Sequence, residues 1–294
     1  MAYDLHVSVI LPTYNRAQIL PTCIDHVLNQ TYKDIDLMIL DDGSIDNTKQ
    51  IIEEYEKKYD NVSGITFDHN ISHPRTKNTG IRETTGDLIF IIEDDLVLDS
   101  DCIQIMVDTF KEKTKQDGRE PVIVPRLIEE LHVSTRIAPV EKAIVTKVPS
   151  YVDPFTGELY NNYGHDFGKV IEVPMGHACC LYPRKYIEKF HGYAEGAYTG
   201  NYCREESDLN MRMIHHGIKF YFQPAAITHH NRINTGGCRV SDTAKGTYYF
   251  VRNHVVFILR NFGGRSVYMV PCFLVAFGTR TALRKAKRVT VNQS

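Results

Sequence analysis

Apolar residues follow two alternating patterns over the first 115 positions of the chain. Short apolar runs rich in β-branched residues predict strands, and apolar residues that recur every three or four positions predict helices. The predicted strands are residues 7–11, 36–40, 62–67 and 88–92. The predicted helices are residues 19–28, 46–59, 74–84 and 101–113. Strands that alternate with helices indicate βαβ crossovers, so we expect an α/β fold with a mostly parallel sheet flanked by helices.

The pattern weakens after a short strand predicted at residues 122–124. Turn-forming residues are frequent between positions 129 and 168, and we interpret this segment as an insertion rather than a separate domain. Regular periodicity returns after the insertion. The predicted elements there are a strand at 177–182, helices at 184–190 and 205–216, a strand at 220–222 and a helix at 243–261.

Acidic residues directly follow two of the predicted strands. Asp41 and Asp42 follow the second strand, and Glu93, Asp94 and Asp95 follow the strand at 88–92. The carboxyl ends of parallel strands meet at one edge of a sheet, where ligands bind. Carboxylates gathered there repel one another unless a cation offsets their charge, and Mg²⁺ or Mn²⁺ prefers such oxygen ligands. The sequence therefore predicts a site for a metal ion and a diphosphate.

Each acidic motif also has an ordinary structural interpretation. Asp42-Gly43 is a common turn dipeptide, and an acidic triplet can simply end a strand in solvent. The two motifs together, both after predicted parallel strands, favour a functional site.

Composition and charge narrow the function. The chain is 43% hydrophobic and 24% charged, with a formal net charge of −2, so we expect no nucleic acid as the main partner. Its seven cysteines include no CxxC pair, which argues against a zinc cage and favours reduced, mostly buried thiols. The first residues lack the pattern of a secretory signal. We therefore expect a cytoplasmic protein.

The C-terminal segment allows two interpretations. Residues 266–279 carry no charge, and basic residues follow within 280–288. This stretch is shorter than the roughly 20 apolar residues that cross a bilayer. It is either a helix packed on the body of the protein or an interfacial helix at the cytosolic face of a membrane.

Five motifs in order resemble one enzyme family. They are VSVILPTYNR, LDDGSIDNT, TKNTGIRETTGDLIFIIEDD, REESDLNMRMIHHG and AAITHH. Together they resemble the inverting family-2 glycosyltransferases with the GT-A fold, over residues 7–115 and 170–232. The resemblance implies a Rossmann-like central sheet and a transferase domain over 1–232. Within it, 1–115 would bind the nucleotide sugar and 116–232, with the insertion, would serve the acceptor. Residues 233–294 would form a C-terminal helical extension.

The resemblance also implies donor contacts at seven positions. They are Pro12, Thr13, Tyr14, Asp42, Arg75, Lys77 and Asp94. Thr13 and Tyr14 would hold the nucleoside, Asp42 would accept a hydrogen bond from the base, and Asp94 would contact the ribose. Lys77 stands where the family more often has arginine, so a point charge replaces a bidentate fork.

Metal binding is implied for two residues, with Mn²⁺ or Mg²⁺ as the ion. Asp95 would bind the metal, and His229 would be a further contact to the metal or diphosphate. His230 is an equally credible source of that contact, and Glu93 is an additional acid whose role stays open.

A carboxylate base is implied at the start of the helix at 205–216. Glu206 occupies the position of the family's catalytic aspartate, and Glu205 and Asp208 remain alternatives. Acidic residues are common at helix N-termini because the helix dipole favours them there, so these residues alone would indicate no site.

These roles imply transfer of a sugar from a nucleoside-diphosphate donor, with UDP favoured, to an acceptor hydroxyl by one displacement. The acceptor would be a glycan, a lipid-linked sugar or a protein. Two other functions are considered. A sugar-nucleotide nucleotidyltransferase would carry a glycine-rich loop after the first strand, where this chain has Thr13-Tyr14-Asn15-Arg16. A non-catalytic sensor would bind the nucleotide sugar without transferring it. The sequence does not indicate an oligomeric state.

Overall fold

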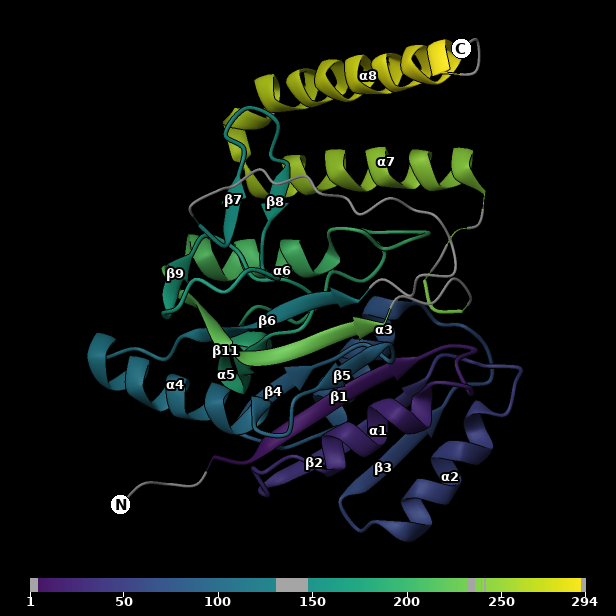
Figure 1. Cartoon of the computed structure of the whole chain (residues 1–294), viewed down its shortest axis with the longest axis vertical. Helices are drawn as coiled ribbons and strands as arrows, with labels where there is room; N and C mark the ends of the chain where they lie inside the picture. The colour runs from purple at the N-terminus through teal and green to yellow at the C-terminus, as the bar shows by residue number, and fades with distance from the viewer. Residues whose placement is uncertain (1–4, 131–147, 232–235, 239, 241, 292–294) are drawn as a thin grey trace.

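The computed structural model describes residues 5–130, 148–231, 236–238, 240 and 242–291. Its centre is a nine-stranded sheet whose main path runs in the order β3-β2-β1-β4-β10-β6-β11-β5, and β9 pairs with β11. Six of these strands run parallel to one another, and β10, β5 and β9 run antiparallel to their neighbours. Helices cover both faces of the sheet (Figure 1). This α/β architecture confirms the predicted fold class.

The N-terminal half consists of βαβ units. Its strands are β1 (Val7–Thr13), β2 (Ile35–Asp41), β3 (Val62–Thr66), β4 (Leu88–Ile91) and the short β5 (Leu96–Leu98). Its helices are α1 (Leu20–Leu28), α2 (Thr48–Lys58), α3 (His73–Glu83) and α4 (Cys102–Asp117). All residues of β1 and β4 are buried, as expected for strands covered on both faces. Gly118 ends α4 in the left-handed conformation, at φ 66°.

The second half completes the sheet with shorter elements. Its strands are β6 (Val122–Glu130), β9 (Ile171–Val173), β10 (Leu181–Pro183) and β11 (Phe220–Asn231), and β7 (Ser150–Val152) and β8 (Leu159–Asn161) form a separate hairpin. Its helices are α5 (Arg184–Lys189), α6 (Glu205–His215), α7 (Thr243–Asn261) and α8 (Ser266–Val291), with a 3₁₀ turn η1 (Gly263–Arg265) before α8.

Three predicted strands have clearly different bounds in the structure, and the others differ by one or two residues at an end. The strand predicted at 122–124 continues to Glu130. The strand predicted at 177–182 begins only at Leu181, because the side chain of His177 accepts the backbone N–H of Cys179 and forms a local turn. The strand predicted at 220–222 instead continues to Asn231, past an irregularity in register between Gln223 and Ile227. Strands β5, β7, β8 and β9, each of three residues, were not predicted.

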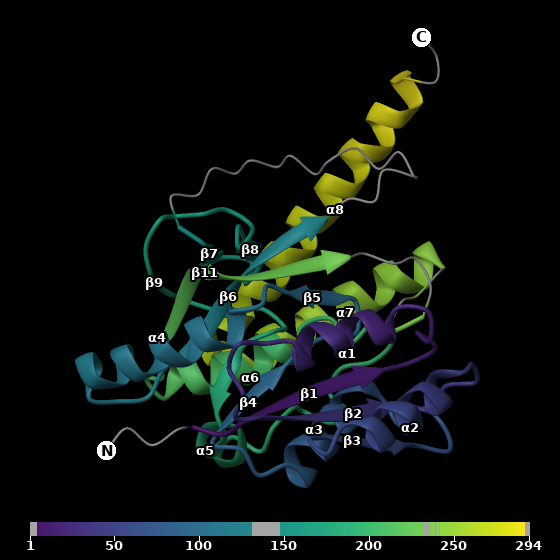
Figure 2. The same cartoon turned by 60° about the horizontal axis from the view of Figure 1, so that its bottom comes forward.

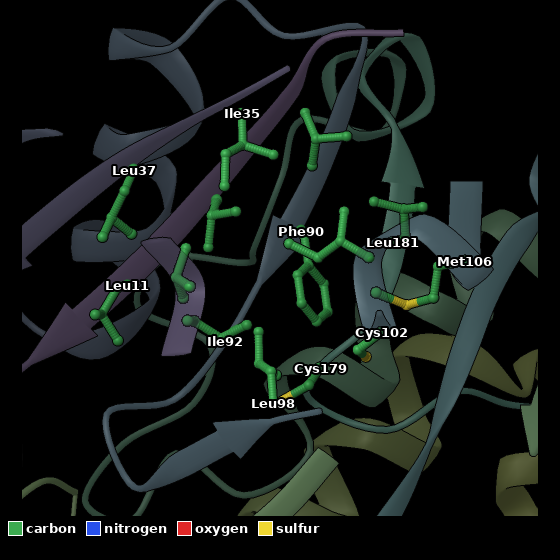
Figure 3. Close-up of a cluster of buried hydrophobic side chains, with 14 of the residues drawn as sticks. Leu11, Ile35, Leu37, Phe90, Ile92, Leu98, Cys102, Met106, Cys179 and Leu181 are labelled. Atoms are coloured by element: carbon green, nitrogen blue, oxygen red, sulfur yellow. The ribbon is translucent and has the colours of Figure 1, made fainter. Parts of the chain in front are cut away.

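Side chains from alternate strand positions form a core on each face of the sheet. One core joins Val9, Leu11 and Phe90 with α1, α2 and α4. Figure 3 shows part of it, with Phe90 and Ile92 between Leu11 and Leu181. The other core joins strand residues of opposite parity with α3, α5 and α6. Packing on both faces therefore fixes the positions of the strand ends.

The C-terminal helices add further layers beyond α6. Phe257 and Ile258 of α7 pack with Met269 and Phe273 of α8 in a third apolar cluster, which also includes Met211 of α6. Figure 1 shows α6, α7 and α8 stacked away from the sheet, with the β7–β8 hairpin reaching to α8. Figure 2 shows the C-terminal end of α8 projecting beyond the body. The assignment of 233–294 as a separate extension stays a prediction.

Candidate functional site

A pocket of about 510 Å³ lies at the carboxyl ends of the parallel strands. The ends of β1, β2 and β4 line it, together with the N-terminus of α6 and His230 of β11. The predicted residues Pro12, Thr13, Tyr14, Asp42, Asp94, Asp95, Glu205 and Glu206 all contribute to this lining. Segments more than 200 positions apart in sequence thus meet in one place, as the strand-end rule predicts.

The loop after β2 forms the end of the pocket where we expect the nucleoside to bind. The carboxylate of Asp42 accepts a hydrogen bond from the backbone N–H of Ile71 at 2.7 Å. Burial raises the pKa of Asp42 above its usual value, and this hydrogen bond opposes the rise. Gly43 has φ +78°, and a Cβ there would lie 2.5 Å from the backbone of His69. A side chain cannot be accommodated at Gly43, so glycine keeps Asp42 in place.

Asp94 and Asp95 form a buried acidic pair that contacts one cation. The Arg16 guanidinium lies 3.3 Å from Asp95 Oδ2 and 3.6 Å from Asp94 Oδ1, and the Thr13 hydroxyl donates to Asp94 at 2.8 Å. Burial raises the pKa of Asp94 to about 6, against the opposing charge of Arg16. Burial would also raise the pKa of Asp95, but His230 and Arg16 outweigh it and lower that pKa.

Glu93, Asp95 and His230 offer ligand atoms that all lie within 4.8 Å of one another. Two carboxylates suit Mg²⁺ or Mn²⁺, and the imidazole nitrogen favours a transition-metal ion, hence Mn²⁺ of the two. His230 Nε2 already lies 3.3 Å from Asp95 Oδ1, so the donor set is assembled. The residues present therefore fit a divalent cation.

The structure separates the two histidine candidates. His229 Nε2 lies 3.0 Å from Asp99 Oδ1, whereas His230 lines the pocket. The two residues are neighbours in β11, and successive side chains of a strand point to opposite faces. Only one of them can face the acidic pair, and that residue is His230.

Glu205, at the start of α6, is held by two cations from α3. Its Oε1 lies 2.8 Å from Lys77 Nζ and 2.7 Å from His73 Nδ1. Glu205 and Lys77 are each 1% exposed. Burial would raise the pKa of Glu205, but Lys77 and His73 outweigh it and lower the pKa to about 2. This contact ties the first half of the chain to α6.

Glu206, the next residue, lines the same pocket without such a partner. Among the described residues, no ion pair involves its carboxylate. Burial and then the charge of Glu205 raise the pKa of Glu206 above its usual value. A partly buried carboxylate with a raised pKa in a cleft is a candidate acid–base group.

Three other candidates, Asp208, Arg75 and Lys77, lie outside the pocket lining. Asp208 is fully buried in a different cluster, where Arg212 and Arg260 contact its carboxylate at 3.0 and 2.8 Å. That environment gives Asp208 a structural role in joining α6 to α7. Arg75 is exposed and pairs with Glu195 at 3.4 Å. Lys77 reaches the site only through Glu205.

Several pocket residues were not assigned a role from the sequence. They are Arg16, Asn70, His73, Gly200, Cys203, Gly237 and Cys238, and Asn201 and Tyr202 join them from the loop before α6. The sequence places Arg16 in the loop after the first predicted strand, at the sheet edge where the acidic residues were expected. Its partner could be inferred only after β1 and β4 were known to be adjacent.

Comparisons with known proteins show which proteins this chain resembles. A family model described as glycosyl transferase family 2 matches residues 8–132. Glycosyltransferase GlyG of Streptococcus pneumoniae is 30% identical over 107 residues, 36% of each protein. Glycosyltransferase AglE of Haloferax volcanii is 33% identical over 91 residues, 30% of each. A Campylobacter jejuni GalNAc(5)-diNAcBac-PP-undecaprenol beta-1,3-glucosyltransferase is 29% identical over 107 residues, 36% of this chain and 35% of that protein. The chain thus spans about a third of the length of these relatives.

Two solved structures resemble the whole chain. Mannosyltransferase PcManGT from Pyrobaculum calidifontis, in complex with GDP-Man and Mn²⁺, has a TM-score of 0.62 at 14% identity. That match covers 100% of this chain and 82% of the other. S. aureus TarS in complex with UDP-GlcNAc has a TM-score of 0.60 at 13% identity, covering 92% of this chain and 72% of the other. At these identities the likeness establishes a shared fold.

Proposed function

We propose that this chain, whose residues 8–132 match the model of glycosyl transferase family 2 and whose fold resembles that of a solved mannosyltransferase, transfers one sugar with inversion. The donor is a nucleoside-diphosphate sugar, with UDP favoured, and the acceptor group is a hydroxyl on a glycan, a lipid-linked sugar or a protein. The observation that carries this proposal is the pocket itself, which is lined by the buried pair Asp94–Asp95 and by Glu206, whose carboxylate forms no ion pair with another described residue.

The donor lies along the strand ends in this proposal. Tyr14 and Asp42 contact the nucleoside, and the carboxylate of Asp42 accepts the imide N–H of a uracil. Asp94 contacts the ribose. The diphosphate extends from there toward Arg16 and His230, both of which line the pocket. One structural neighbour binds UDP and another binds GDP-Man. A donor with either nucleotide is therefore compatible with this fold.

Glu93, Asp95 and His230 are the residues that would hold a divalent cation. Such an ion, when bound, would offset the negative charge that grows on the departing nucleoside diphosphate. Arg16 is already placed beside the same carboxylates and contributes positive charge at that end of the pocket. The sequence left His229 and His230 as alternatives, and this assignment takes His230, which lines the pocket.

The proton transfer is assigned to Glu206. As the acceptor oxygen forms a bond to the anomeric carbon, its hydroxyl proton passes to the Glu206 carboxylate. The bond between the anomeric carbon and the diphosphate oxygen breaks at the same time, and the electron pair leaves with the nucleoside diphosphate. The raised pKa of Glu206 makes its carboxylate a stronger base than an ordinary exposed glutamate.

The test is the variant Glu206→Gln, which keeps the size of the side chain and removes its basicity. We expect the affinity of this variant for the nucleotide sugar in the presence of Mn²⁺, measured by thermal shift, to stay within about twofold of that of the parent. Transfer to acceptor should fall by about 10²–10⁴-fold, the usual contribution of a general base.

Glu188→Gln is the matched control, because Glu188 lies on α5 with an exposed carboxylate outside the pocket. That variant should transfer sugar at the parent rate. Normal transfer by Glu206→Gln would overturn the base assignment. Donor binding without transfer by the parent protein, across acceptors of all three classes, would instead support a sensor.

A further inference from the structure

The outward face of α8 is apolar over about five turns. Its most exposed large side chains are Val267 at 80%, Val275 at 69% and Leu283 at 58%, with Leu274 at 45%. Residues 266–279 include no charged side chain. Single exposed apolar residues are ordinary on a protein surface, but a continuous helical face of this kind indicates an interaction surface.

The opposite face of α8 is anchored to the body. Met269 and Phe273 are fully buried against α7, and Arg280 Nη2 contacts Glu158 Oε1 at 2.6 Å. The helix is long and apolar enough to cross a membrane by length and composition, over residues 263–283. Because one side of the helix is packed on the protein, we assign it an orientation along a surface instead of across a bilayer.

The β7–β8 turn borders the same surface. Phe155, in this turn, is 64% exposed, and the neighbouring Pro154 accepts a hydrogen bond from the Tyr268 hydroxyl at 3.4 Å. Figure 1 shows the hairpin reaching the first turns of α8. A second element therefore presents an aromatic side chain beside the helix. We call Phe155 together with Val267, Leu274, Val275 and Leu283 the α8 face.

The C-terminal segment of the chain differs in charge from the rest of the sequence. The last 52 residues, 243–294, contain nine Lys and Arg residues and no Asp or Glu. The preceding 242 residues carry 36 acidic residues against 25 Lys and Arg. The formal charge of the C-terminal segment is thus opposite to that of the rest of the chain. An apolar helical face within a basic segment is typical of helices that lie on anionic lipid.

We propose that the α8 face docks the protein on an anionic membrane surface, with the helix lying in the plane of the interface. A second copy of the chain is a poorer occupant. Symmetric pairing through α8 would bring two segments of like charge together, and like charges across an interface oppose association. Membrane docking does not depend on the proposed sugar transfer, and either could hold without the other.

The experiment uses the full chain and sedimentation with vesicles. We expect binding to vesicles of phosphatidylglycerol and phosphatidylcholine, and at least tenfold weaker binding to phosphatidylcholine alone. Raising the salt concentration should weaken binding, because salt screens the attraction between basic side chains and anionic lipid. The double variant Leu274→Asp/Val275→Asp should bind the anionic vesicles at least tenfold less, because both side chains are exposed and each gains a negative charge.

Ile45→Asp is the matched control, since Ile45 is 92% exposed in the loop after β2. It should bind vesicles like the parent, and thermal unfolding should show that both variants stay folded. Phe155→Asp tests the hairpin separately, with a smaller loss expected from one side chain. Undiminished vesicle binding by the double variant would overturn the proposal. A dimer that the parent forms without lipid and that the double variant does not form would also overturn it. So would protein that stays in the vesicles after extraction with alkaline carbonate.

Discussion

Two pairs of adjacent carboxylates line the pocket, and the positions of the nearby cations make them different. In each pair one pKa is lowered and the other is raised. Asp95 is the lowered member beside His230 and Arg16, while burial raises the pKa of its neighbour Asp94 to about 6. Lys77 and His73 lower the pKa of Glu205, and burial raises that of Glu206.

The difference lies in what surrounds each paired carboxylate. Asp95 shares its cation with Asp94 and faces Glu93 and His230, so it can also accept a metal ion. Glu205 is enclosed with Lys77 and His73 and has no such opening for a further cation, since Glu205 and Lys77 are each 1% exposed. The two pairs of carboxylates are therefore suited to different roles. The Asp94–Asp95 pair is suited to hold positive charge, and in the Glu205–Glu206 pair Lys77 and His73 contact Glu205, which agrees with the base that we propose at Glu206.

The largest expected effect comes from removing the cation of the Glu205 pair. Lys77→Met leaves Glu205 as a buried charge with only His73 beside it, which should lower the free energy of unfolding by about 3–5 kcal/mol. Arg75→Met, on the same helix, removes an exposed ion pair and should cost about 1 kcal/mol or less. Urea unfolding of both variants measures the difference.

Arg16→Met sharpens the contrast between the pairs. It removes the built-in cation of the Asp94–Asp95 pair, but Mn²⁺ can restore positive charge there and should recover most of the lost stability. Mn²⁺ should not recover Lys77→Met. Equal rescue of the two variants, or of neither, would contradict the distinction between an open and an enclosed pair.

A smaller effect is expected at the two neighbouring histidines of β11. His230→Ala should weaken Mn²⁺ binding about tenfold or more, because it removes one member of the Glu93–Asp95–His230 cluster. His229→Ala should change Mn²⁺ affinity by less than about twofold, since His229 contacts Asp99. Calorimetric titration with Mn²⁺ tests both variants, and a larger loss from His229→Ala would reverse the assignment.

The sequence predicted the N-terminal half of the fold well, and the reason is physical. Strands such as β4 are buried on both faces and therefore read as continuous apolar runs, bounded by turn residues. The later strands carry weaker signals. Strands β7, β8 and β9 are too short to show periodicity. Strand β11 continues past a register irregularity between Gln223 and Ile227, which includes Pro224, and its length could not be read from the short apolar run at 220–222.

The site was predictable as far as strand ends could locate it. Asp42, Asp94 and Asp95 follow predicted parallel strands, and all three line the pocket. The choice between His229 and His230 depended on a strand that continues to Asn231, because alternation then decides which side chain faces inward. The cations beside the carboxylates, Arg16 and His73, depend on contacts between distant segments. No local pattern reports such contacts.

The smallest expected effect is a change in the pH dependence of transfer. Glu206 acts as a carboxylate, and its pKa is raised in the folded protein, so transfer should fall as the pH decreases through that raised pKa. Glu205→Gln removes the neighbouring negative charge that contributes to the rise. The acidic limb of kcat should therefore move to lower pH, by about one unit or less, equivalent to about 1.4 kcal/mol. Glu188→Gln should leave the limb in place. A limb that stays unmoved in Glu205→Gln would show that the two glutamates are not coupled, and would leave burial and the charge of Glu93 as the causes of the raised pKa of Glu206.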